Sequence, residues 1–185
     1  MDKKTIIGII GEQAGGKGAA ADIIRKHFGG SRLTVSNMLR RTLDSLCLDS
    51  TRDNLVNLGI ILKKGFGDDV LMKAMLNDVE NEDADLVIVD GFRMPGDPDV
   101  FREAYDNSFY LIYVTAGQEI RYERSVKRGE KVGESDADFE EFTAKENLET
   151  EKHISEVGKT ADFKIENNEN EKELEKKILQ VMKKI

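Results

Sequence analysis

The sequence predicts a three-layer α/β/α fold around a five-stranded parallel sheet. Short β-branched apolar runs alternate with longer stretches that carry apolar residues at helical spacing. The first run, 6–10, leads through a glycine-rich turn into a helix, as a buried parallel strand does. The 185 residues suffice for one substantial core, so residues 1–185 are expected to form a single domain.

The elements are expected to follow one another with short connections. Strands are predicted at 6–10, 33–35, 86–90, 109–114 and 161–165. Helices are predicted at 19–28, from a cap at Ser36 or Asn37 through Leu46, from Thr51 to a break at Gly65-Phe66-Gly67, from Val70 through Leu76, at 119–127, at 139–157 and up to Ile185. The region of about 36–80 is therefore helical, and the polar stretch within about 129–150 predicts a lid.

Charge and cysteine content exclude several classes of protein. The chain has 28 basic and 36 acidic residues, a net charge of −8, which argues against nucleic acid or an anionic membrane as the main partner. Cys47 is the only cysteine, so no internal disulfide can form, and we expect it in the core. No apolar run is long enough to span a membrane, and a cytoplasmic location is expected.

The turn after the first strand fits the phosphate-loop pattern G-x-x-x-x-G-K. Glycines let backbone N–H groups surround a phosphate, and the following helix N-terminus adds partial positive charge. Lys17 would bridge the β- and γ-phosphates. An ordinary glycine-rich turn is the alternative, which the strand and helix on either side disfavour. The expected ATP-binding residues here are Gly11, Gln13, Ala14, Gly15, Gly16, Lys17, Gly18 and Ala19.

The magnesium site is expected to depart from the usual phosphate-loop arrangement. The position after Lys17 normally has a Ser or Thr hydroxyl for Mg²⁺, but Gly18 and Ala19 carry none. Phosphate oxygens, water and carboxylates elsewhere would then hold Mg²⁺, which keeps several waters. Asp90 ends the predicted strand 86–90, at the edge of the sheet where ligands sit. It is therefore a candidate outer-shell ligand or base, with a capping role as the alternative.

Arginines supply the candidate phosphate ligands of the acceptor. Arg93 follows Asp90 closely, and a guanidinium can bind phosphate through two hydrogen bonds. Arg40 and Arg41 follow the second strand and are further candidates, unless they are simply solvated surface residues.

A second group of arginines precedes the predicted lid. Arg121, Arg124 and Arg128 share one helix face and are candidates for neutralising the transferring phosphoryl group. Pairing with Glu119, Glu123 and Glu130 is the alternative.

The pattern resembles the nucleoside monophosphate kinase superfamily of P-loop proteins over nearly the whole chain. The motifs are the phosphate loop with glycine after the lysine, Asn37-Met38-Leu39-Arg40, and Asp90-Gly91-Phe92-Arg93, which lacks the family's proline. The resemblance implies acceptor binding by Ser36, Arg40 and Arg93, and a magnesium-linked role for Asp90. It also implies that Lys17, Asp90, Arg93 and Arg124 are catalytic.

In detail the chain is similar to a branch described as dephospho-coenzyme A kinase-like. The matching segments are 51–55, Leu58-Gly59, Phe66-Gly67, 121–124, 127–130, 161–163, Ile165 and Asn167-Asn168. The turn after the last strand lies against the adenine in that branch, which implies that Asn167, with Arg124, contacts ATP. The acidic residues of the lid depart from the arginine-bearing lids of adenylate kinases.

Three classes of function remain open. The leading hypothesis is an ATP- and Mg²⁺-dependent kinase for a small phosphate-bearing acceptor, either a nucleoside or deoxynucleoside monophosphate or the ribose hydroxyl of dephospho-coenzyme A. A nucleotide-binding switch or regulatory ATPase is a second class, favoured by the missing hydroxyl at Gly18. A structural P-loop fold without nucleotide binding is disfavoured by Lys17 and its glycines.

Overall fold

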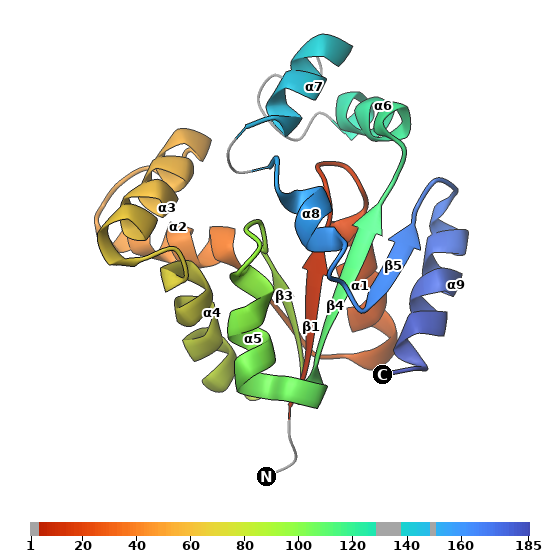
Figure 1. Ribbon diagram of the computed structural model, residues 1–185, viewed down its shortest axis with the longest axis horizontal. Helices are drawn as coiled ribbons and strands as arrows, with labels where there is room; N and C mark the ends of the chain where they lie inside the picture. Colours follow the sequence, from red (N-terminus) through yellow and green to blue (C-terminus); the bar gives the residue numbers. More distant parts are fainter. Residues whose placement is uncertain (1–3, 129–137, 149–150) are drawn as a thin grey trace.

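The computed structural model describes residues 4–128, 138–148 and 151–185, and a parallel sheet forms its centre (Figure 1). The sheet has five strands in the order β2-β3-β1-β4-β5, and every pairing is parallel. The strands are β1 (Thr5–Ile10), β2 (Ser31–Thr34), β3 (Leu86–Asp90), β4 (Phe109–Thr115) and β5 (Phe163–Glu166). The predicted fold class is confirmed.

Helices cover both faces of the sheet. One face packs against α1 (Lys17–Phe28) and α9 (Glu171–Met182). The other packs against α2 (Val35–Ser45), α3 (Arg52–Phe66), α4 (Val70–Glu80), α5 (Asp97–Tyr105) and α8 (Ile154–Gly158). A single 3₁₀ turn, η1 (Asp106–Ser108), precedes β4. Helices α6 (Gln118–Arg128) and α7 (Phe139–Glu146) lie beyond the edge where the strands end (Figure 1).

The central strand shows why the sequence folds into three layers. Ile6 and Ile10 belong to the core beside α4 and α5, whereas Ile7 and Ile9 belong to the core beside α1 and α9. Successive side chains of a strand point to opposite faces, so a strand buried on both sides must be apolar throughout. Gly8 interrupts this run, because a Cβ there would lie 2.9 Å from the side chains of Phe109 and Leu111.

Strand register brings the chemically important positions to one edge. Asp90 is paired with Ile9 on one side and with Thr34 on the other. Thr115 at the end of β4 is paired with Glu166 at the end of β5. The strands thus end at a common level, and ligands of open α/β sheets bind outside this carboxyl edge.

The helix predicted at 139–157 is wrong, because the structure has two helices there. α7 ends at Glu146 and α8 begins at Ile154, with a turn in which the Glu151 N–H donates to the carbonyl of Leu148 at 2.8 Å. Leu148 is the only apolar residue between Ala144 and Ile154, so no continuous apolar face could hold one long helix. Two parts of the predicted lid, residues 129–137 and 149–150, lie outside the described residues.

Three local expectations are also corrected. The cap of α2 is Thr34, whose hydroxyl accepts the Asn37 N–H at 3.0 Å, so neither Ser36 nor Asn37 is the cap. Cys47 is exposed and has a φ of +56°, so it ends a helix turn instead of filling the core. Sequence analysis missed α5, although Pro98 in its first turn is a typical helix start.

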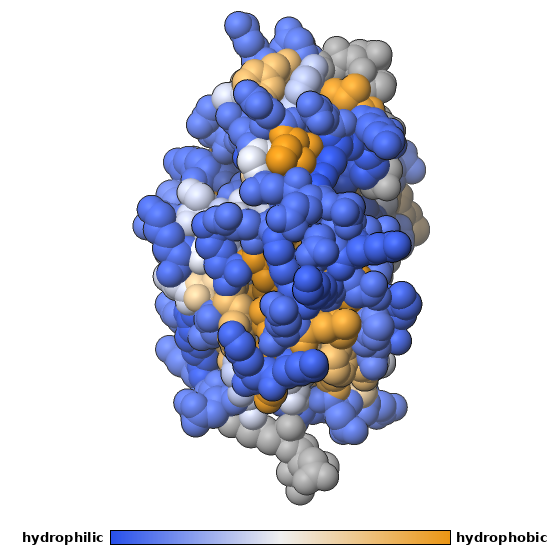
Figure 2. Space-filling model, turned by 90° about the vertical axis from the view of Figure 1, so that its right-hand side faces the viewer, coloured by the Kyte–Doolittle hydropathy of each residue, from blue (hydrophilic) through white to orange (hydrophobic). Residues whose placement is uncertain are grey.

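The surface agrees with the high charge content. The face on the α9 side of the molecule is largely hydrophilic, with separate apolar areas between charged side chains (Figure 2). Among the described residues, no helix combines the length and the apolar character needed to cross a membrane.

We expect the aromatic cluster of the α5 layer to contribute strongly to stability. Phe101 is fully buried, and its ring centroid lies 5.5 Å from that of Phe92 and 5.6 Å from that of Phe109. Phe101→Ala should lower the free energy of unfolding by about 3–5 kcal/mol, because it removes a buried ring and leaves a cavity. The matched control is Phe66→Ala, whose side chain is 73% exposed, and urea unfolding of both variants measures the difference. Similar losses in both would contradict the placement of Phe101.

Candidate active site

The predicted phosphate loop, residues 11–17, lies between the end of β1 and the start of α1. The Gly15 N–H donates to the Glu12 carbonyl at 3.1 Å, and Gly16 has a φ of +109°. α1 begins at Lys17, and no described side chain caps it. The N–H groups of its first turn are therefore available to an anion, which a helix N-terminus favours.

Close packing explains two of the loop glycines. A Cβ at Gly11 would overlap the Val114 carbonyl of β4, and a Cβ at Gly16 would overlap the side-chain amide of Asn167. That amide donates to the Gly15 carbonyl at 3.0 Å, and Asn167 is buried. Asn167 thus braces the loop through its side chain, and its contact with ATP stays a prediction.

Lys17 is partly buried and is directed back to its own loop. Its Nζ donates to the carbonyls of Gly11 at 2.5 Å and Glu12 at 3.1 Å. Burial lowers the pKa of Lys17, while the carboxylates of Asp90, Glu151 and Glu12 raise it and the Arg93 guanidinium lowers it further. An anionic phosphate in the cleft would favour the charged ammonium in the same way as these carboxylates.

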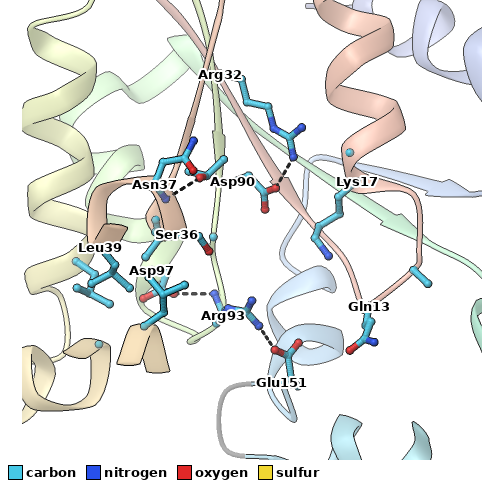
Figure 3. Close-up of a pocket in the computed structure, with 18 of the residues that line it drawn as sticks. Gln13, Lys17, Arg32, Ser36, Asn37, Leu39, Asp90, Arg93, Asp97 and Glu151 are labelled. Atoms are coloured by element: carbon cyan, nitrogen blue, oxygen red, sulfur yellow. Dashed lines mark hydrogen bonds and ion pairs between the residues drawn. The ribbon is translucent and has the colours of Figure 1, made fainter. Parts of the chain in front are cut away.

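Asp90 lies where the sequence placed it, at the end of β3, and it is paired with an unforeseen partner. Its Oδ2 accepts from Arg32 Nη2 at 2.9 Å, across the β2–β3 pairing (Figure 3). Arg32 is also 3.8 Å from Asp22 of α1. Asp90 is therefore no helix cap, and its charge is partly neutralised within the cleft wall.

Arg93 is held on a well-defined backbone. The Arg93 and Met94 N–H groups donate to Oδ2 of the buried Asp97 at 2.7 and 2.9 Å. The other carboxylate oxygen of Asp97 is 3.9 Å from Lys63 Nζ on α3. Nη1 of Arg93 forms an ion pair with Glu151 (Figure 3). Arg93 is thus held between α5 and Glu151, which precedes α8.

The other predicted arginines divide into two groups. Arg40 lines the cleft together with Ser36 and donates to Asn37 Oδ1 at 2.8 Å. Arg41 does not line the cleft, and its guanidinium pairs instead with Asp78 of α4. Arg124 and Arg128 line the cleft, and Arg124 donates to the carbonyls of Asn167 at 2.8 Å and Glu169 at 3.0 Å.

The position of Arg121 contradicts both interpretations given for the α6 arginines, charge neutralisation in the cleft and pairing with Glu119 or Glu123. It is buried, donates to the Ala116 carbonyl at 2.9 Å, and pairs with Glu146 of α7. Its guanidinium carbon is 5.9 Å from the centre of the Phe142 ring. It therefore joins α6 to α7 and neither faces the cleft nor pairs within its own helix.

Lys17, Asp90 and Arg93 line one open cleft of about 1710 Å³ at the carboxyl edge of the sheet, together with Ser36, Arg40, Arg124 and Arg128. Its described lining includes 12 basic and 7 acidic side chains, although the whole chain has a net charge of −8. Positive charge is thus concentrated in the cleft, which favours anionic ligands. No group of three or more metal-ligating side chains is found in the described residues.

The sequence is similar to archaeal proteins whose names state no activity. A UPF0200 protein of Methanosarcina barkeri is 25% identical over 177 residues, covering 96% of this chain and 94% of that protein. A UPF0200/UPF0201 protein of Archaeoglobus fulgidus is 25% identical over 97% of this chain, which spans only 55% of its length. No family model matches the chain.

The fold is similar to that of several solved structures, including two kinases. Shikimate kinase from Acinetobacter baumannii superimposes with a TM-score of 0.62 at 13% identity, covering 99% of this chain and 95% of that one. A gluconokinase from Sinorhizobium meliloti gives 0.59 at 13% identity, with 99% and 93% covered. TT1252 from Thermus thermophilus gives 0.62 at 20% identity, with 99% and 98% covered. The chain therefore shares the overall fold of these proteins.

The partners that position the predicted residues could not be predicted from the sequence. Arg32, Asp97 and Glu151 all line the cleft and contact Asp90 or Arg93. Arg32 and Glu151 are each 58 residues from their partners, so no local spacing could indicate them. Only Asp97, four residues after Arg93 and next to Pro98, carried a local signal, that of a helix start.

The contrast between two arginines of α6 provides a test. Arg121→Met should lower the free energy of unfolding by about 2–4 kcal/mol, because it leaves Glu146 without its buried partner. Arg124→Met should change stability by less than about 1 kcal/mol and weaken ATP binding, because Arg124 lines the cleft. Thermal unfolding and calorimetric ATP titration of both variants measure these effects. Our assignment would be contradicted if Arg124→Met lost the stability and Arg121→Met weakened ATP binding.

Proposed function

We propose that the protein is an ATP-dependent phosphotransferase that acts on a small phosphate-bearing acceptor, a nucleoside or deoxynucleoside monophosphate. The observation that carries this proposal is that one cleft contains two separate sets of groups able to bind phosphate. Lys17 and the start of α1 line it on one side, and Arg93 and Arg40 line it on the other. A simple nucleotide switch needs the first group and has no use for the second.

The donor half has the features that a nucleoside triphosphate requires. Backbone N–H groups of the loop and of α1 would bind the β- and γ-phosphates, and Lys17 would leave the Gly11 and Glu12 carbonyls to bridge them. Arg124 is anchored to the turn after β5, beside the loop, where it can contact the nucleotide.

The acceptor half combines cations with an apolar wall. Along α3, the residues that line the cleft are apolar in the middle, where Leu55, Val56 and Ile60 lie. Cations line the cleft at both ends of this helix, at Arg52 and at Lys64. Apolar walls with a few placed charges suit a nucleoside better than a small polyol, which offers little apolar surface.

Transfer would need positioning and charge neutralisation more than a base. An anionic oxygen of the acceptor phosphate attacks the γ-phosphorus, the bond to the β–γ bridging oxygen breaks, and ADP leaves with that oxygen. Lys17 would follow the charge on the donor side, and Arg93 would hold the acceptor phosphate in line. Because the nucleophile is already an anion, Asp90 need not accept a proton.

The cleft also fits a magnesium ion that retains water. Gly18 lines it and carries no hydroxyl, and Asp90 has a carboxylate at the strand end, so Asp90 would hold the ion through water. When bound, Mg²⁺ supplies positive charge to the β- and γ-phosphate oxygens.

A transfer assay tests the proposed activity. The protein is incubated with Mg-ATP and each of a panel of nucleoside monophosphates and dephospho-coenzyme A, and ADP and phosphorylated acceptor are measured. We expect a monophosphate to be phosphorylated, and Lys17→Ala to reduce turnover by at least about a hundredfold with the fold intact. Phosphorylation of dephospho-coenzyme A alone would replace the acceptor that we propose. Phosphate release without any acceptor product would instead favour a regulatory ATPase.

Arg93 should act on the acceptor more than on ATP. Arg93→Ala should raise the KM of the acceptor at least about tenfold, because a charge-assisted pair with its phosphate is lost, and leave the KM of ATP within about twofold. The matched control is Arg41→Ala, which removes an arginine that pairs with Asp78 outside the cleft. Steady-state kinetics with each substrate varied would contradict the assignment if both KM values rose equally.

A further inference from the structure

Arg93 has an anionic partner supplied by another part of the chain. Nη1 of Arg93 forms an ion pair with Oε1 of Glu151, and both residues line the cleft (Figure 3). The Glu151 side chain is only 18% exposed, compared with 41% for Arg93. The Glu151 carboxylate thus binds one nitrogen of the guanidinium to which the proposed function assigns the acceptor phosphate.

The turn that carries Glu151 is firmly attached to the core. Its N–H donates to the Leu148 carbonyl at 2.8 Å, and its carbonyl accepts the Ile154 N–H at 3.0 Å. Ile154 and Val157 of the following helix α8 are 3% and 0% exposed. The carboxylate is therefore positioned by packed structure, unlike that of a freely rotating surface glutamate.

Glu151 also acts on the phosphate loop. Its charge raises the pKa of Lys17, whereas the Arg93 charge lowers it, so the carboxylate is within electrostatic reach of both cations. Figure 3 shows Glu151 beside Arg93, on the same side of the cleft as the loop residue Gln13. One fixed negative charge thus balances the cations of the donor and acceptor halves.

We propose that Glu151 is a specificity-determining residue, whose carboxylate remains on Arg93 until a phosphate group displaces it. The inference rests on the proposed role of Arg93 as the acceptor-phosphate ligand. A phosphate monoester carries a charge of about −1.5 to −2 at pH 7 and three acceptor oxygens, whereas a carboxylate carries one charge. The interaction of a phosphate with the Arg93 guanidinium is therefore more favourable than the Glu151 interaction that it replaces. A carboxylate-bearing acceptor only replaces one carboxylate by another, so its binding is not favoured.

Removing the charge of Glu151 should have an effect opposite to that expected for a ligand-binding residue. Glu151→Gln keeps the shape of the side chain and an oxygen for Arg93, and it removes the competing charge. Inorganic phosphate should bind about three- to tenfold more tightly, because a partly exposed ion pair no longer has to be broken. The affinity for acetate should increase by at least the same factor, so the ratio of phosphate affinity to acetate affinity should decrease.

Isothermal titration calorimetry with inorganic phosphate and with acetate tests this in a double-mutant cycle. The proteins are the wild type, Glu151→Gln, Arg93→Ala and the double variant. Glu156→Gln is the matched control, because it removes the same charge from the 64% exposed side chain of Glu156 on α8. We expect tighter phosphate binding in Glu151→Gln, no gain in Glu156→Gln, and no gain when Arg93 is already alanine.

Two results would overturn the proposal. Unchanged or weaker phosphate binding in Glu151→Gln would mean that the carboxylate orients Arg93 for its ligand. A gain that persists in the Arg93→Ala background would mean that Glu151 acts through the general field of the cleft. Because these titrations require no turnover, they remain readable if the transfer assay detects no phosphorylated acceptor, which would refute the proposed function separately.

Discussion

The close packing of the phosphate loop against the ends of β4 and β5 is the constraint on which the site depends. Glycine is required at Gly11 and Gly16 because Val114 and Asn167 leave no space for a Cβ. Asn167 is itself fixed, since its N–H donates to the Thr115 carbonyl at 2.7 Å and its own carbonyl accepts from Arg124. Loop, strand ends and α6 therefore form one connected unit, and the first turn of α1 can face the cleft only because this unit closes behind it.

The parallel sheet extends this order to the side of the cleft that carries Arg93 and α2. Asp90 is paired in register with Thr34, which caps α2, so the end of β3 and the start of α2 are joined through a single pairing. Asp97 then fixes the backbone at Arg93 and lies near Lys63 of α3. A carboxylate that is only 4% exposed is costly to bury without partners, so these contacts explain its position. Arg93 is thus positioned by both the sheet and the helices that line the cleft.

The sequence predicted what contiguous residues determine. The order of strands and helices follows from apolar runs and glycine breaks, and the loop at 11–17 is recognisable because its chemistry is local. Ion pairs between distant segments, such as Arg32 with Asp90 and Arg93 with Glu151, depend on sheet order and on the turn before α8, which no spacing reveals. Arg121 was misjudged for the same reason, since its partner Glu146 belongs to another helix. Cys47 was misplaced because cysteine is usually buried, a tendency that a helix end can override.

Two cations of the cleft, Lys17 and Arg93, have internal partners in the structure. The described lining of the cleft holds 12 basic side chains, and their mutual repulsion is reduced where a carbonyl or carboxylate lies beside a cation. Lys17 is bound to loop carbonyls and Arg93 to Glu151, so neither depends on a ligand to be satisfied. Binding a polyphosphate then exchanges one set of partners for another. The free energy of ligand binding is then the interaction of the cation with the phosphate minus its interaction with the internal carbonyl or carboxylate. That difference is larger for a more highly charged ligand.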